Sequence, residues 1–129
     1  MKLATIFNKQ GKRIAYYILK DVELDDFRAE LAEEGQTLTA KKLTDKSLAK
    51  ALLSCYEDQS FTLAAHLFDL LYESSIFIGP SDVSEGFYDA ARMVYSARNA
   101  SKRLEMTKGL IEDYFIDPLS ECRKPMDGA

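Results

Sequence analysis

The sequence predicts an α+β fold that is predominantly helical, with an N-terminal β-hairpin packed on about five helices. The first twenty residues (1–20) are rich in β-branched and aromatic side chains on either side of a glycine-containing turn. The segment from residue 21 to residue 117 places apolar side chains at helical spacing between capping residues. The length of 129 residues, with no repeat and no linker rich in proline and glycine, predicts one domain over 1–129 that ends in a tail at 118–129.

The hairpin is predicted from the segments KLATIF and RIAYYIL, which NKQGK joins through Gly11. Leu3 and Phe7 would share one face of the first strand. Ala4 and Ile6 would share the other. A strand that is apolar on both faces is expected to be covered on both, by helices or by a partner, and a lone hairpin is marginal in water.

The first two helices are predicted over Asp25–Glu34 and Asp45–Glu57. Gly35 stands where many helices end in a left-handed residue, and Thr44 is a suitable N-cap for the second helix. The connector QTLTAKK contains a candidate third strand at Thr37–Thr39.

The third helix is predicted over Phe61–Ser74, with Ser60 as its cap. Its polar positions before the C-terminal end are spaced by four, three and four residues, so they form one narrow line: Thr62, His66, Asp69 and Glu73. A helix that is apolar over most of its circumference belongs at the centre of a bundle, so this helix is predicted to be the most buried. After it, Ile76–Ile78 either adds a strand to the hairpin or plugs the core.

Two more helices are predicted, over residues 82–98 and 101–116. Ser81 or Ser84 would cap the first of them. Asn99 and Ser101 leave two arrangements open, either a break with a new cap or one long helix.

The net charge of −4 is distributed in blocks of alternating sign. Residues 1–20 carry five basic side chains and no acidic one, whereas residues 51–91 carry seven acidic side chains and no basic one. Such blocks either compensate each other within the fold or present charged patches to partners. A pI near 5.0 argues against a nucleic-acid-binding protein, because such proteins usually have a basic domain.

Motifs for catalysis or metal binding are missing from the sequence. Cys55 and Cys122 lack zinc-type spacing, Cys55 is expected in the core, and the glycines form no phosphate loop. The single histidine, His66, precedes Asp69 by three positions, so the two could form a general base or an ordinary surface pair. We expect no catalytic residue, no metal ligand and no cofactor, with a small enzyme using His66 and Asp69 as the third functional hypothesis.

The sequence also predicts a cytoplasmic protein. It starts without the apolar run of a signal peptide, and no stretch approaches the ~20 apolar residues of a membrane span. For that reason no membrane partner is expected. Two cysteines without a pattern are typical of a compartment that keeps thiols reduced, so no bridge between Cys55 and Cys122 is expected.

The fourth predicted helix offers the best candidate for a binding surface. Four of its side chains are spaced by four, three and four residues: Tyr88, Arg92, Tyr95 and Asn99. Arg103 extends this line if the helix continues. Tyr and Arg are enriched at binding hot spots, and such side chains also stack on bases. Alternatively, the tyrosines flank the core while the arginine stems cover apolar surface.

The first predicted helix offers a second candidate surface, which is acidic. It carries Asp25, Asp26, Glu30 and Glu33. This face is either simply solvated or binds a basic partner.

We therefore expect a non-catalytic protein that acts by binding another macromolecule, with another protein as the expected partner. Inhibitor, immunity and phage counter-defence proteins are often of this size, acidic and poor in motifs, although this association identifies no family. The alternative is a nucleic-acid-binding regulator that uses the basic hairpin and the Tyr/Arg helix face. A homodimer is compatible with either hypothesis.

Overall fold

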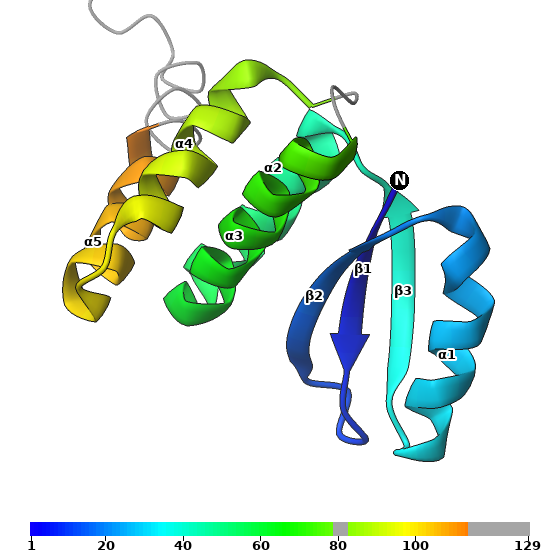
Figure 1. The fold of residues 1–129 in the computed structure, drawn as a ribbon. Helices are drawn as coiled ribbons and strands as arrows, with labels where there is room; N and C mark the ends of the chain where they lie inside the picture. Colours follow the sequence, from blue (N-terminus) through cyan, green and yellow to red (C-terminus); the bar gives the residue numbers. More distant parts are fainter. Residues whose placement is uncertain (79–82, 114–129) are drawn as a thin grey trace, which may run out of the picture.

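The computed structural model describes residues 1–78 and 83–113, with the backbone alone for residues 75–78. The described chain contains one antiparallel sheet and five α-helices (Figure 1). In chain order the elements are β1 (Lys2–Phe7), β2 (Arg13–Leu19), a 3₁₀ turn η1 (Asp21–Glu23), α1 (Leu24–Glu33), β3 (Thr37–Lys42), α2 (Asp45–Glu57), α3 (Phe61–Ile78), α4 (Glu85–Ser96) and α5 (Ala100–Ile111). The α+β, predominantly helical fold with an N-terminal hairpin is confirmed.

The sheet has the strand order β2-β1-β3, so β1 is the central strand. The predicted hairpin is confirmed, with a register shift between Ile6 and Phe7. The third strand is longer than the predicted Thr37–Thr39, because β3 pairs along the whole of β1 as far as Lys42. Pairing with a strand distant in sequence outweighs the weak strand preference of the two lysines at its end.

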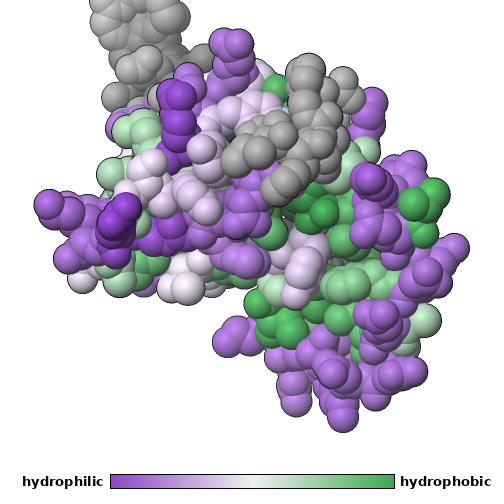
Figure 2. Space-filling model, viewed as in Figure 1, coloured by the Kyte–Doolittle hydropathy of each residue, from purple (hydrophilic) through white to green (hydrophobic). Residues whose placement is uncertain are grey.

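Both faces of the sheet are covered, as the apolar pattern of β1 predicts. Ala4 and Ile6 pack with Leu31 of α1 on one face. Leu3 and Tyr16 pack with α2 and α3 on the other. Accordingly, α1 and the other helices lie on opposite sides of the sheet in Figure 1, and the space-filling view shows a helical lobe and a lobe made of the sheet with α1 (Figure 2).

Helices α1 and α2 follow their local signals closely. α1 begins at Leu24, one residue earlier than expected, because η1 leads into it directly. Gly35 has the positive φ of +74° predicted for it. α2 has its predicted bounds, and the Thr44 hydroxyl accepts a hydrogen bond from the Ser47 amide at 3.2 Å.

Helix α3 continues to Ile78, four residues beyond its predicted end. The strand considered for Ile76–Ile78 is therefore wrong. β1 already has a strand on each side, and the helical backbone overrides the β-preference of this apolar run.

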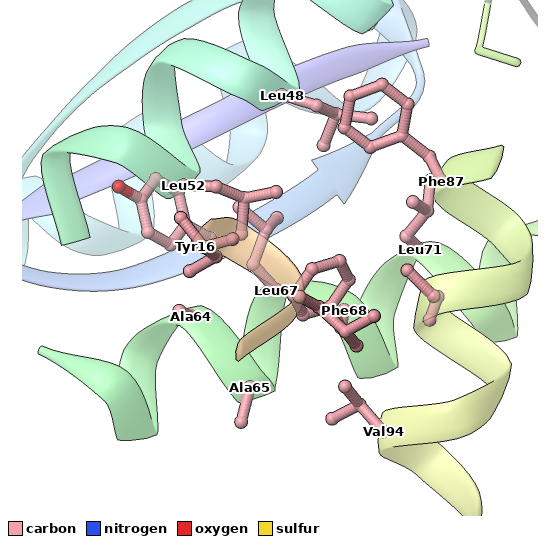
Figure 3. Close-up of a cluster of buried hydrophobic side chains, with 14 of the residues drawn as sticks. Tyr16, Leu48, Leu52, Ala64, Ala65, Leu67, Phe68, Leu71, Phe87 and Val94 are labelled. Atoms are coloured by element: carbon pink, nitrogen blue, oxygen red, sulfur yellow. The ribbon is translucent and has the colours of Figure 1, made fainter. Parts of the chain in front are cut away.

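The core is built around α3. The side chains of Ala64, Ala65, Leu67, Phe68 and Leu71 are at most 2% exposed, and Figure 3 shows several of them between α2 and α4. On the predicted polar line, Thr62, His66 and Glu73 are exposed and Asp69 is half-buried. From residue 61 to residue 74, the side chains off this line are buried or half-buried, and Cys55 of α2 is fully buried.

Helices α4 and α5 are separate. The Asn99 side chain accepts a hydrogen bond from the Lys102 amide at 3.0 Å and caps α5, so the alternative of one long helix is wrong. α4 ends at Ser96, two residues before its predicted end at Arg98. The N-cap of α4 is Ser84. Outside the described residues lie the other candidate cap, Ser81, and the part of the fifth predicted helix beyond residue 113. Cys122 and the predicted tail also lie outside them.

Candidate functional site

The predicted Tyr/Arg face lies along one flank of α4. The core side of this helix consists of Phe87, Ala90, Ala91 and Val94, all buried. Tyr88, Arg92 and Tyr95 follow one another at spacings of four and three residues, which places them together beside that core side. Tyr88 is partly buried against the core, whereas Arg92 and Tyr95 are exposed.

Tyr95 contacts a second aromatic ring on this flank. It is 49% exposed, and its ring lies 4.7 Å from the ring of Tyr72 on α3, tilted by 37°. Contact between two aromatic rings holds both in place without burying them fully. We call Tyr72, Tyr88, Arg92 and Tyr95 the tyrosine surface. The sequence pattern could not include Tyr72, because this residue belongs to another helix.

Arg92 is held only loosely within the fold. Its guanidinium donates to Asp89 at 3.1 Å, and the side chains of this pair are 64% and 61% exposed. Exposed ion pairs of this kind contribute about 0–1 kcal/mol to stability. The guanidinium is therefore available to a partner at small cost.

The remaining predicted contact residues have roles inside the fold. Asn99 is exposed but caps α5. Arg103 donates to the backbone carbonyl of Val94 at 3.0 Å, to that of Ala65 at 3.3 Å and to the carboxylate of Asp69. Arg103 of α5 thus binds groups on α3 and α4. We therefore do not include Arg103 in the tyrosine surface.

The pair considered for general-base catalysis is not formed. Asp69 directs its carboxylate to Arg103, and the described residues show no hydrogen bond between His66 and Asp69. His66 is exposed and lines a groove of about 540 Å³ between β2 and the start of α3, together with Ile14 and Phe61. Among the described residues, Asp69 therefore does not orient the imidazole of His66.

The acidic face of α1 is fully accessible. Asp25, Asp26, Glu30 and Glu33 are exposed, and no ion pair joins any of them to another described residue. Beside them, Val22 is 84% exposed. Hydrophobic surface also lies over the strands in Figure 2, and Ile14 and Tyr17 of β2 are 41% and 39% exposed.

Within residues 1–78 and 83–113 no group of three or more His, Cys, Asp or Glu side chains is arranged to hold a metal ion. None of the helices in the same ranges combines the length and the apolar character needed to cross a membrane. Comparison of this chain with protein-family models, with curated proteins and with solved structures finds no match.

Proposed function

We propose that this protein works without catalysis by binding another protein through the tyrosine surface. The observation that supports the proposal is the half-exposed Tyr95, whose ring is held against Tyr72 next to an Arg92 that has only an exposed ion pair. Rigid aromatic side chains around a guanidinium provide contact area, planar hydrogen bonding and charge with little loss of conformational entropy.

The chain offers a matched control on the same helix. Met93 is 47% exposed, nearly as much as Tyr95. It follows Arg92 by one residue, about 100° around the helix, and therefore lies on the other flank. A change at Met93 removes similar exposed area without touching the tyrosine surface.

The test is quantitative capture of partners from lysate of the cells that make this protein. Wild type, Tyr95→Ala and Met93→Ala are used as bait, and mass spectrometry compares the proteins retained. The proposal predicts one protein retained by wild type and Met93→Ala and lost with Tyr95→Ala. Equal retention by all three baits contradicts it, and retention of nucleic acid alone favours the regulator hypothesis.

A further inference from the structure

A second site lies at a distance from the tyrosine surface, in a cleft between α2 and the sheet. The cleft has a volume of about 170 Å³. That volume is roughly ten times the ~15 Å³ that one water needs, and it is below the ~300 Å³ of pockets that enclose drug-sized ligands. The cleft therefore has room for a small ion or a single functional group, and not for a whole metabolite.

Three cationic side chains from three elements line this cleft. They are Arg13 of β2, Lys41 of β3 and Lys50 of α2. No carboxylate lines the cleft. Arg13 forms an ion pair with Asp58, which does not line the cleft. Three cations and one carboxylate leave a charge of +2. That charge matches a phosphoryl group, which carries about −1.5 to −2 near neutral pH.

The two lysines of the cleft remain available as hydrogen-bond donors, and one buried donor beside them has no partner. The Nε of Arg13 is buried and has no hydrogen-bond partner. Lys41 and Lys50 are exposed, and neither forms an ion pair with the described residues. Arg and Lys are the side chains that proteins use most to bind phosphate oxygens.

Hydroxyl groups and an apolar floor complete the site. Thr5, Thr39 and Ser54 line the cleft with the cations, and each hydroxyl can donate to an oxyanion. Leu3 and Tyr16, both buried, lie beneath them. Interactions between charges are stronger next to such a low-dielectric wall than in water.

A simpler explanation covers part of this pattern. β3 is an edge strand, and lysines on edge strands discourage pairing with other chains. That explains Lys41, but it does not explain Lys50, which comes from a helix and lines the same cleft.

We propose that the cleft between α2 and the sheet binds a phosphoryl group, carried by free phosphate or by a small phosphate ester.

The test is a titration of the intact protein, followed by amide chemical shifts, at constant ionic strength set with sodium chloride. The probes are inorganic phosphate, adenosine monophosphate and adenosine. Phosphate and the monophosphate are expected to shift the amides of Thr39, Lys41 and Ser54, whereas adenosine is not. Tighter binding of the monophosphate identifies an ester as the ligand, and equal or weaker binding identifies free phosphate.

Two variants and one control locate the site. Lys41→Gln and Lys50→Gln should each weaken phosphate binding at least about tenfold, the size of one charge-assisted hydrogen bond. Lys46→Gln changes an exposed lysine of α2 that does not line the cleft, so its affinity should equal that of wild type. All three residues are exposed, and unchanged thermal unfolding of the variants verifies that the fold is retained.

Three results would overturn the proposal: no saturable shifts with phosphate, an equal loss in Lys46→Gln and Lys50→Gln, or binding of a nucleic acid duplex without any binding of phosphate. Because the residues tested lie apart from Tyr95 and Arg92, failure of this proposal leaves the tyrosine surface untouched, and the reverse also holds.

Discussion

Arg103 shows at the residue scale how one polar side chain joins three helices. Its side chain is 23% exposed, and its guanidinium donates to acceptors on α3 and α4. Arg103→Ala would leave the half-buried Asp69 carboxylate without its cation, so the free energy of unfolding should fall by about 2–4 kcal/mol. Denaturant titration measures this loss.

The paired variant Arg103→Leu/Asp69→Leu is the control for that prediction. Removing both charged groups leaves no uncompensated carboxylate, so the double variant should be more stable than Arg103→Ala alone. If Arg103→Ala has the same free energy of unfolding as the wild type, the guanidinium does not hold the helices together. Arg103 then becomes a candidate contact residue again.

Tyr16 and Cys55 make stability depend on alkaline pH. Their side chains contact each other at 3.6 Å in the core, and burial raises the pKa of the Tyr16 phenol and of the Cys55 thiol. The unfolded chain therefore releases these two protons at lower pH than the folded chain does. Their contribution to stability is complete below the unfolded pKa values, about 8.5 for Cys and 10 for Tyr, and decreases as pH rises beyond them.

We expect the free energy of unfolding of the wild type to fall as pH rises above about 8.5. Above pH about 10, the free energy of unfolding of Tyr16→Phe should fall less steeply than that of the wild type. Urea titrations at several pH values measure both slopes. Parallel slopes for wild type and Tyr16→Phe would contradict the assignment.

At the scale of elements, α3 carries the core, and two of its side chains test this directly. Phe68 is 1% exposed, whereas His66 lies on the exposed line of the same helix. Phe68→Ala should lower the free energy of unfolding by about 3–5 kcal/mol. His66→Ala should lower it by less than about 1 kcal/mol. Equal losses in a denaturant titration would show that α3 is not oriented as described.

Elements with strong local signals could be predicted from the sequence. α2 has a capping threonine and an apolar stripe, and the hairpin has a glycine turn between two β-rich segments, so both were located correctly. The end of β3 was harder to predict, because it depends on pairing with a strand distant in the sequence. Ile76–Ile78 was harder because a short apolar run fits a strand and a buried helix equally well. Neither local propensity nor periodicity contains that information.

The candidate site was predictable to a similar extent. Spacing alone placed Tyr88, Arg92 and Tyr95 on one flank of α4. Tyr72 and the cleft cations come from separate segments, and only the packing of helices and strands brings them together. The partner of Arg103 was likewise hidden, because Asp69 precedes it by 34 residues.

At the scale of the whole molecule, the described residues are held together by packing around a core that contains Cys55 as a free thiol. Cys55 is fully buried as a free thiol in the core between the sheet and the helices. Adding reductant should therefore leave the melting temperature unchanged, which differential scanning calorimetry measures. A sharp drop on reduction would reveal a disulfide that contributes to stability.

The charge blocks of the sequence are partly compensated and partly displayed. Arg13 pairs with Asp58 and Arg103 with Asp69, across distant segments of the chain. The acids of α1 and the lysines of the cleft form no such pairs with the described residues. The molecule thus presents an acidic helix, a basic cleft and an aromatic surface at three places.

The affinity of single-site variants for the captured partner tests the proposed binding function most directly. Isothermal titration calorimetry should show Arg92→Ala and Tyr95→Ala each weakening binding by at least about 2 kcal/mol, with Met93→Ala close to wild type. Denaturant titration should show both variants within about 1 kcal/mol of wild-type stability. Unchanged affinity, or variants that unfold instead, would show that Tyr95 and Arg92 only pack against their neighbours, and would contradict the binding surface.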